Sequence, residues 1–313
     1  MTSSKKKIVI TEFMDEAAVN ALRAEFEVVY DPSLVDDNER LLAQVAEASA
    51  VIVRNRTQMR GTLLAACAKA TVIGRLGVGL DNIDVPVCEA RGMRVIPASG
   101  ANALAVAEYV IGTAMALLRG AYLSSTDVAS GTWPRAALSN GREISGKRLG
   151  LIGFGGIGRL TAKLAQGLGM SVIAHDPMLP LDSPVWRDTS VQCSTLEALI
   201  MSADVVSLHV PLTASTTDLL SAANVARMKR GAVVINTSRG GIANEAAVAA
   251  AVRSGHLGGA AFDVFEPEPL GPDNVWKECR NIILTPHVAG VTAESNVRVS
   301  TLIAVEVARY LKT

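Results

Sequence analysis

One stretch of this sequence, residues 148–176, limits the possible folds more than any other. Its apolar run Leu149–Ile152 predicts a short buried strand, and Gly153, Gly155 and Gly158 follow with the spacing G-x-G-x-x-G. The pattern over 159–168 predicts a helix, and a second apolar run ends on Asp176. A glycine turn between a strand and a helix, with an acidic residue at the end of the next strand, is typical of dinucleotide-binding βαβ units.

Each glycine of this motif has a mechanical reason in such a site. The first permits the tight turn, the second lets the backbone approach a pyrophosphate, and the third lets the helix pack closely on the strand. Free N–H groups and the positive end of the helix dipole then face the phosphates. A carboxylate at Asp176 accepts hydrogen bonds from a ribose diol and repels a 2′-phosphate, which favours NAD over NADP. The alternative is a glycine turn without a nucleotide, and the surrounding strand, helix and acid argue against it.

Composition excludes several classes of protein. The 313 residues suffice for two domains with substantial cores. Lys+Arg and Asp+Glu both number 30, and this zero net charge argues against a broad nucleic-acid surface or a polybasic membrane patch. The apolar run after Lys5-Lys6-Lys7 is three residues long, so it predicts a first strand and not a signal peptide, and no run reaches membrane-spanning length. Four scattered cysteines without a CxxC pair favour a reduced, cytoplasmic location and indicate neither a disulfide framework nor a metal site.

Short apolar runs alternate with helical patterns through both halves of the chain. This alternation predicts the α/β class, with parallel sheets covered by helices on both faces. We expect a long apolar helix over 102–118 to connect two domains, a proline-rich loop over 177–188, and a closing helix over 293–311. Ligands of such sheets collect at the carboxyl ends of the strands, which places Arg54 and the loops 76–82 and 97–102 on one rim.

Three polar residues follow predicted strands in the second half: Arg239, Glu268 and His287. Hydride transfer between a hydroxy acid and NAD needs a cation for the substrate carboxylate, and a planar guanidinium binds a carboxylate bidentately. It also needs a base for the hydroxyl proton near the working pH, which suits a histidine. A neighbouring carboxylate would orient that histidine and favour its protonated form.

Each of these residues also has an ordinary structural explanation. An arginine after a strand is usually a solvated loop charge, Glu268 between two prolines could be an exposed turn acid, and His287 could be a packed core histidine. Their joint occurrence behind a dinucleotide motif, in a chain with only four histidines, favours the functional interpretation.

Five motifs in order resemble the D-isomer-specific 2-hydroxyacid dehydrogenase family over nearly the whole chain. They are Gly153–Gly158 with Asp176, His209–Thr213, Asn236–Gly241, Asp263–Pro269 and Thr285–Gly290. The resemblance implies catalysis by His287 as acid and base, Glu268 as its partner and Arg239 as substrate anchor. It implies a discontinuous, flavodoxin-like substrate domain (1–100 plus 288–313), an inserted Rossmann NAD domain (101–287), a homodimer built on the NAD domains, and closure of the cleft over the substrate. The NAD contacts that we expect are Gly153, Gly155, Gly156, Ile157, Gly158, Asp176, His209, Val210, Pro211, Thr216, Thr237, Ser238, Arg239, Asp263, His287, Gly290 and Val106.

Within the family, the segments Val53–Thr57, Gly77–Asn82 and Ala101–Glu108 look most like 3-phosphoglycerate dehydrogenases, and Ile10–Asp15 with 54–57 is similar to the (S)-sulfolactate dehydrogenase branch. This similarity implies substrate contacts from the backbone of Val78 and Gly79 and from Asn102, besides Arg239 and His287. Two features depart from the phosphoglycerate branch. Asn55 stands where that branch often has serine, and the chain ends after one terminal helix, so we expect no regulatory domain.

The supply of arginines near the expected cleft suggests a second anion on carbon 3 of the substrate. We expect Arg54 and Arg135 to bind it, whereas Arg60 and Arg142 fit better as surface residues. A sulfonate and a phosphate both satisfy this expectation, so 3-sulfolactate and 3-phosphoglycerate remain open. Glyoxylate or hydroxypyruvate reduction needs no second anion and is the alternative. An NAD-sensing binding protein, similar to the corepressors that resemble this family, is a further alternative from another class.

Overall fold

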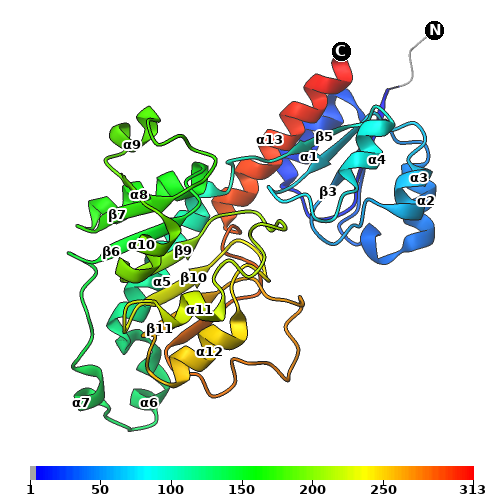
Figure 1. Cartoon of the computed structure of the whole chain (residues 1–313). Helices are drawn as coiled ribbons and strands as arrows, with labels where there is room; N and C mark the ends of the chain where they lie inside the picture. The colour runs from blue at the N-terminus through cyan, green and yellow to red at the C-terminus, as the bar shows by residue number, and fades with distance from the viewer. Residues whose placement is uncertain (1–4) are drawn as a thin grey trace. The chain divides into compact units, whose positions relative to one another are not determined.

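Two parallel β-sheets organise the part of the chain that this computed structural model describes, residues 5–313. Contacts divide these residues into two units: unit 1 runs to Asn102 and resumes with Val291–Thr313, and unit 2 is Ala103–Gly290. Each unit has its own sheet and its own helices on both faces (Figure 1). The predicted doubly wound α/β class is therefore confirmed.

The sheet of unit 1 has five strands in the order β2-β1-β3-β4-β5. They are β1 (Lys7–Ile10), β2 (Glu27–Tyr30), β3 (Ala50–Val53), β4 (Val72–Arg75) and β5 (Arg94–Pro97). All four residues of β3 are buried, as expected for a strand that is covered on both faces. This order is flavodoxin-like, and sheets of this kind bind ligands where the strand order reverses, here between β1 and β3.

Helices cover both faces of this sheet. Helices α1 (Glu16–Glu25) and α13 (Ala293–Lys312) pack on one face, and the short helices η1 (Leu34–Asp36), α2 (Asn38–Val45), α3 (Gly61–Ala66) and α4 (Val85–Ala90) lie over the other. Gly74 in β4 lets α13 approach closely, because a Cβ there would lie 2.7 Å from the side chain of Ile303 and 2.9 Å from that of Val307. Helix α13, although distant in sequence, thus completes the core of unit 1.

The sheet of unit 2 has seven strands in the order β12-β11-β10-β9-β6-β7-β8. They are β6 (Arg148–Ile152), β7 (Ser171–His175), β8 (Gln192–Cys193), β9 (Val205–Leu208), β10 (Val233–Asn236), β11 (Gly259–Phe262) and β12 (Ile282–Leu284). This is the Rossmann order with one outer strand added, and the order reverses between β6 and β9. The carboxyl ends of these two strands therefore mark the expected dinucleotide site.

Two helix layers enclose the sheet of unit 2. Helices α5 (Ala103–Arg119) and α8 (Gly156–Gly167) cover one face, and α10 (Leu196–Ser202), α11 (Ala222–Ala226) and α12 (Glu245–Arg253) cover the other. A stacked pair of rings, Phe154 and Trp186, with centroids 5.2 Å apart, closes the layer beside β7. Because helices cover both faces of the sheet, both sides of the central strands are buried, and the strand sequences are therefore almost continuously hydrophobic.

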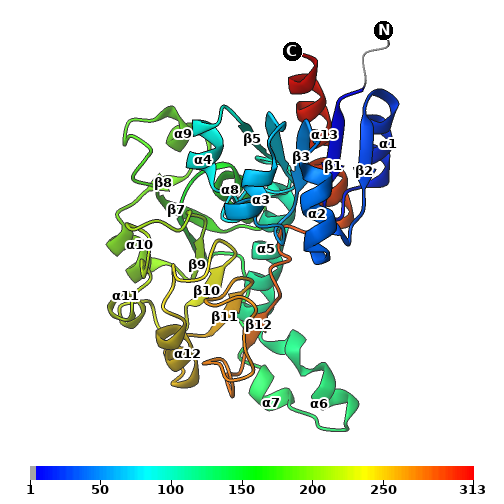
Figure 2. The same cartoon turned by 90° about the vertical axis from the view of Figure 1, so that its right-hand side faces the viewer.

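Some local expectations were wrong. The expected loop 177–188 ends in a short helix, α9 (Pro184–Asp188), which Pro184 begins at a position that suits proline. No helix was predicted for the stretch after α5, which contains η2 (Ala121–Ser124), α6 (Ser125–Ala129) and α7 (Arg135–Leu138); these helices stand apart from the sheet of unit 2 (Figure 2). Helix α8 begins at Gly156 instead of residue 159, because its first turn is built from the glycine motif itself.

Across residues 5–313, no single helix has both the length and the apolar composition to cross a membrane. Helix α5 meets those criteria only together with residues 121–129, and that pair is bent by 73°. All four cysteines are free thiols. The described part of the chain brings no three His, Cys, Asp or Glu side chains together in a way that would hold a metal ion.

Candidate active site

The glycine turn after β6 has the shape that a bound dinucleotide requires. Gly153 has φ +96°, and a Cβ there would lie 2.4 Å from the carbonyl oxygen of His209. A Cβ at Gly158 would lie 2.5 Å from the carbonyl oxygen of Gly153. Gly155 and Gly156, in contrast, are exposed, and a Cβ on either would meet no described atom within 4 Å. The protein itself therefore needs the first and third glycines, and the open space above the second fits an approaching pyrophosphate.

The N-terminus of α8 lies at this open space. Its N-cap is Gly155, and no side chain in the described residues caps the first turn. N–H groups of a first turn have no partner within the helix, so they are available to phosphate oxygens. Four of the NAD contacts expected from the sequence, Gly155, Gly156, Ile157 and Gly158, belong to this turn.

Asp176 follows β7 and ties two segments together. Its Oδ2 accepts a hydrogen bond from Phe154 N at 2.8 Å, and its Oδ1 accepts one from Met178 N at 3.0 Å. Each carboxylate oxygen has a second lone pair that a ribose hydroxyl can use. The negative charge at the edge of the glycine turn fits a free ribose diol better than a 2′-phosphate.

The loop after β9 carries His209, Val210, Pro211 and Thr216. Ser207 Oγ lies 2.9 Å from Nε2 of His209, and burial lowers the pKa of His209 to about 4, so its ring is neutral at pH 7. Thr216 closes the turn, because its Oγ1 accepts from Thr213 N at 2.8 Å and donates to Pro211 O at 2.6 Å. His209 and Val210 lie beside the first glycine, because a Cβ on Gly153 would meet the backbone of His209 and the side chain of Val210.

The loop after β10 is organised by a buried amide, Asn236. Its Oδ1 accepts from Ser238 N at 3.0 Å, and its Nδ2 donates to Arg239 O at 2.9 Å. Arg239 is half-buried, and its Nη1 donates to Ser238 O at 2.6 Å. Thr237 Oγ1 is buried and has no hydrogen-bond partner in residues 5–313. A buried hydroxyl without a partner at the carboxyl end of a Rossmann strand fits a polar group of NAD, because such groups are otherwise satisfied.

Glu268 and His287 come together at the other loops of this rim. His287 Nδ1 lies 2.8 Å from Glu268 Oε2, and both side chains remain partly exposed, at 44% and 37%. Glu268 Oε1 accepts a second hydrogen bond from Phe265 N at 3.0 Å, which fixes the carboxylate. A carboxylate on Nδ1 orients the ring and leaves Nε2 for proton exchange. A Cβ on Gly240 would lie 2.1 Å from Phe265 O, so the loop of Arg239 also lies against the loop of Glu268.

Asp263 holds the loop that carries His287. Its carboxylate, 1% exposed, accepts from Thr285 Oγ1 at 2.6 Å, Val288 N at 2.8 Å and Ala289 N at 2.8 Å. His287 itself has φ +57° and donates its N–H to Asp263 O at 2.9 Å. Left-handed backbone in a non-glycine residue costs free energy, so the surrounding contacts hold it in place. The sequence suggested Asp263 as an NAD contact, and in the structure its carboxylate binds the loop 285–289, which ends beside Gly290.

Unit 1 has its own polar rim at the carboxyl ends of β3 and β4. Arg54 follows β3, is half-buried, donates from Nη2 to Asn296 Oδ1 at 2.7 Å, and lies 5.8 Å from the centroid of the Phe13 ring. Burial lowers the pKa of the Arg54 guanidinium and the nearby Glu12 carboxylate opposes this shift. Val78 and Gly79 lie in the loop after β4, with Val78 40% exposed. Asn102 Oδ1 is buried with no partner in the described chain.

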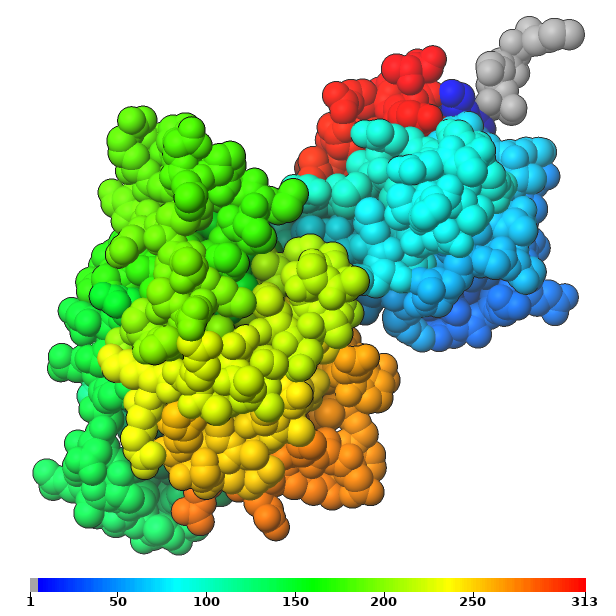
Figure 3. All heavy atoms as spheres, in the orientation of Figure 1, coloured from blue at the N-terminus to red at the C-terminus, as the bar shows by residue number. Residues whose placement is uncertain are grey.

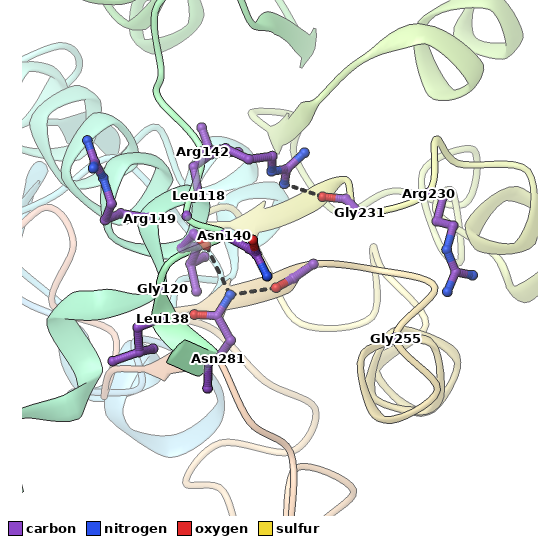
Figure 4. Close-up of a pocket in the computed structure, with 14 residues that line it drawn as sticks. Leu118, Arg119, Gly120, Leu138, Asn140, Arg142, Arg230, Gly231, Gly255 and Asn281 are labelled. Carbon is purple, nitrogen blue, oxygen red and sulfur yellow. Dashed lines mark hydrogen bonds between the residues drawn. The ribbon is translucent and has the colours of Figure 1, made fainter. Parts of the chain in front are cut away.

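The structure does not bring Arg135 to the expected substrate site of its own chain. Arg135 begins α7, and the residues just after α7 line a cavity of about 400 Å³ beside the segments that precede β10, β11 and β12 (Figure 4). This is the amino-terminal edge of the sheet, whereas Arg239 and His287 follow strands at the carboxyl edge. Arg135 was expected at the cleft because it lies in the segment that connects the two predicted domains. The position of such a segment depends on what it packs against, and the sequence pattern does not show this. Val106, expected as an NAD contact, is buried in α5.

Three organising residues escaped the sequence argument: Glu12, Asn236 and Glu245. Glu245 begins α12, and its carboxylate accepts from Trp276 Nε1 and Glu266 N, both at 3.0 Å, which positions the loop before Glu268. Burial raises the pKa of Glu245, and its contacts with Trp276 and Glu266 N oppose this shift. A polar residue at the end of a predicted buried strand, or within two positions of it, was the available signal: Asn236 ends β10, and Glu12 follows the end of β1 by two positions.

Comparison with known proteins agrees with a dinucleotide-binding dehydrogenase site. The model of the D-isomer specific 2-hydroxyacid dehydrogenase NAD binding domain matches residues 111–289. The (S)-sulfolactate dehydrogenase of Chromohalobacter salexigens is 50% identical over 304 residues, which is 97% of this chain and 98% of that protein. The D-3-phosphoglycerate dehydrogenase of Archaeoglobus fulgidus is 34% identical over 98% of this chain and 57% of its own length. This chain thus spans about half the length of the phosphoglycerate dehydrogenases that it matches.

The crystal structure of the TT0316 protein from Thermus thermophilus has a TM-score of 0.88 with 30% identity, and the match covers 98% of this chain and 97% of that one. A family model matches more than half of the chain, and a relative is 50% identical over nearly its full length. Both findings agree with the glycine turn and the His287–Glu268 pair. This chain therefore belongs to the D-isomer specific 2-hydroxyacid dehydrogenase family, and it is an NAD-dependent dehydrogenase.

Proposed function

We propose that this dehydrogenase oxidises (S)-3-sulfolactate to 3-sulfopyruvate with NAD. The observation that carries the proposal is the 50% identity to the Chromohalobacter salexigens enzyme over nearly the full length of both chains, against 34% for the phosphoglycerate dehydrogenase of Archaeoglobus fulgidus. A D-configured hydroxy acid with a 3-sulfo group is named S, because sulfur outranks the carboxyl carbon. (S)-Sulfolactate and D-3-phosphoglycerate therefore present the same hand, and the group on carbon 3 distinguishes them.

In this proposal unit 2 binds NAD and carries the acid–base chemistry. The guanidinium of Arg239 pairs with the substrate carboxylate. Nε2 of His287 accepts the hydroxyl proton while Nδ1 stays bonded to Glu268, whose charge stabilises the protonated ring. The O–H electron pair forms the carbonyl, and the hydrogen on carbon 2 leaves with its electron pair. NAD, when bound, supplies the hydride acceptor. In the reverse direction His287 returns the proton to the new hydroxyl.

Unit 1 supplies substrate recognition. We assign the second anion to Arg54, because its half-buried guanidinium donates to a neutral amide, Asn296, and the nearby Glu12 carboxylate accepts from backbone N–H groups instead of from the guanidinium. The backbone of Val78 and Gly79 would hold the substrate carboxylate. The buried and unpartnered Oδ1 of Asn102 would accept a hydrogen bond once the substrate binds.

The deciding experiment compares initial rates of NADH formation with (S)-3-sulfolactate, D-3-phosphoglycerate and D-lactate, and of NADH consumption with glyoxylate and hydroxypyruvate. A preference of orders of magnitude in kcat/KM for sulfolactate supports the proposal. A preference for phosphoglycerate keeps the second anion and changes its identity. Rapid reduction of glyoxylate with no preference for an anionic substrate would make the protein a general 2-ketoacid reductase, and NADH binding without turnover would point to a binding protein.

We further propose that the protein is a cytoplasmic homodimer assembled through unit 2. The segment 121–133 exposes large apolar side chains, and Figure 3 shows it, in green, as a protruding part of that unit. Its exposed members are Tyr122 at 61%, Leu123 at 46%, Val128 at 44% and Trp133 at 74%. Clustered exposed aromatic and aliphatic side chains favour an interface. Sedimentation analysis of the native chain and of Trp133→Ser tests this proposal, with a shift toward monomer expected for the variant.

A further inference from the structure

Glu12 follows β1 and is one of the few charged residues of residues 5–313 that are buried. Its side chain is 4% exposed. A buried carboxylate costs free energy unless hydrogen bonds compensate it. Asp204, also buried, is compensated by an ion pair with Lys229 at 2.7 Å. Glu12 is compensated in a different way, through the backbone of another loop.

Three backbone N–H groups of the loop after β3 converge on Glu12. Oε1 accepts from Arg54 N at 2.9 Å and from Thr57 N at 3.0 Å, and Oε2 accepts from Arg56 N at 3.1 Å. Successive N–H groups that point into one concavity form an anion-binding nest. Here the protein fills its own nest with a carboxylate. Both oxygens act as acceptors, so neither a hydroxyl nor a neutral amide can replace the group fully.

The same loop is held from its other side by Asn82. This side chain, 5% exposed, donates from Nδ2 to Arg54 O at 3.1 Å and to Thr57 O at 2.7 Å. Thr57 Oγ1 also lies 2.8 Å from Thr11 Oγ1, next to Glu12. Glu12 therefore fixes the N–H groups and Asn82 the carbonyls of a loop that contains Arg54.

We propose that Glu12 is a positioning residue for recognition of the substrate's second anion. This inference rests on the proposed function, in which Arg54 binds that anion. Because Glu12 occupies the backbone N–H groups, the anion has to be recognised by the guanidinium and not by the nest. Because the loop is held at three N–H groups, the guanidinium is presented from a fixed backbone, and less ordering is needed on binding.

The test compares Glu12→Gln, Glu12→Ala and a control, Tyr30→Phe. The control acts on the segment between β1 and α1, which also contains Glu12. It removes the two hydrogen bonds of the Tyr30 hydroxyl, to Met14 O at 2.9 Å and from Met14 N at 3.3 Å, without touching the loop 54–57. For each protein, KM and kcat are measured with (S)-3-sulfolactate and with glyoxylate, which has no second anion. The Kd for NADH reports on folding of the NAD-binding unit, and amide hydrogen exchange of Arg54, Arg56 and Thr57 reports directly on the loop.

We expect Glu12→Gln to raise KM for sulfolactate by about tenfold or more, which is the loss expected for charged hydrogen bonds, with kcat and the glyoxylate constants nearly unchanged. The three amides should exchange faster, and Tyr30→Phe should change none of these quantities. Glu12→Ala removes a fragment the size of acetate, so added acetate should refill the nest and lower KM again, whereas acetamide should not.

An unchanged KM for sulfolactate in Glu12→Gln would overturn the inference, as would equal losses with sulfolactate and glyoxylate, which indicate a merely structural role. Failure of acetate to restore slow exchange in Glu12→Ala would also contradict it. The wild-type substrate preference tests the proposed function separately, before any variant is measured. If the wild type shows no preference for a second anion, the proposed function fails, and the amide exchange still decides whether Glu12 holds the loop.

Discussion

The loop after β6 in unit 2 and the loop after β3 in unit 1 both present backbone N–H groups at the carboxyl end of a central strand, and the protein treats them in opposite ways. The first turn of α8 has no capping side chain among the described residues and has open space above Gly155. The N–H groups at Arg54, Arg56 and Thr57 already bind the buried carboxylate of Glu12.

The difference separates two ways to recognise an anion. A backbone left open binds a phosphate through dipoles that no side-chain substitution removes, and it depends on glycine for access. A backbone that is filled internally leaves recognition to a side chain, whose charge and length can change between relatives. The cofactor site is therefore set by geometry, and the substrate site by the identity of a few side chains.

Loss of the acid–base group should reduce activity most, and it serves as the reference because it alters neither loop. In His287→Ala the acid–base group is lost, so kcat should fall by about 10²–10⁴-fold. The substitution leaves the glycine turn free to bind the phosphates of NADH and leaves the Glu12 carboxylate in its nest. The Kd for NADH should therefore stay near the wild-type value. Stopped-flow turnover and fluorescence titration with NADH measure the two quantities. Retained turnover would remove His287 from the mechanism.

Arg54→Ala tests the loop that relies on a side chain. Loss of a desolvated charge pair costs about 2–5 kcal/mol, so KM for sulfolactate should rise by at least about 30-fold. Glyoxylate reduction should change little, because glyoxylate has no second anion. Steady-state kinetics with both substrates measure the ratio. If both substrates lose equally, the assignment of the second anion to Arg54 is wrong.

Gly155→Ala and Gly153→Ala form a matched pair for the loop that relies on the backbone. A methyl group at Gly155 meets open space and an ordinary backbone conformation, so thermal unfolding without NADH should be unchanged while the Kd for NADH rises by roughly tenfold or more. At Gly153 the same change meets His209 O and a positive φ, and should cost about 1–3 kcal/mol of stability. Equal losses of stability in the two variants would contradict this division.

A change of one pH unit below neutrality should have a weaker effect than any of these substitutions, and it concerns a residue next to the open loop. Burial lowers the pKa of His209 to about 4, so below its ordinary pKa the unfolded chain binds a proton that the folded chain does not. The free energy of unfolding should therefore fall as the pH falls from about 6.5 toward 4, by less than about 1 kcal/mol between pH 7 and pH 6. Denaturant titrations at several pH values should show this slope, and His209→Gln should flatten it. The same slope in both proteins would mean that another group titrates.

Much of this architecture follows from local pattern. The strand–turn–helix over 149–168 and the strand that ends on Asp176 are short-range features, because apolar periodicity and glycine spacing act within a few residues. The motif after β12 placed His287 correctly at a strand end, and the structure brings it to Glu268, 19 positions earlier. The hydrophobic pattern alone could not predict the order of the strands. Runs such as Ala50–Val53 and Val233–Asn236 look alike in the sequence, and only packing determines which strands become neighbours.

Residue types and their close spacing were enough to predict the α/β class, the family, the cofactor motif and the three candidate catalytic residues. Three features became visible only in the folded chain: Glu12 fills the nest 42 to 45 positions away, Asp263 holds the His287 loop, and Arg135 begins a helix near the amino-terminal edge of its sheet. These contacts join segments far apart in the chain, and they form only when the parallel strands are set in one order and register.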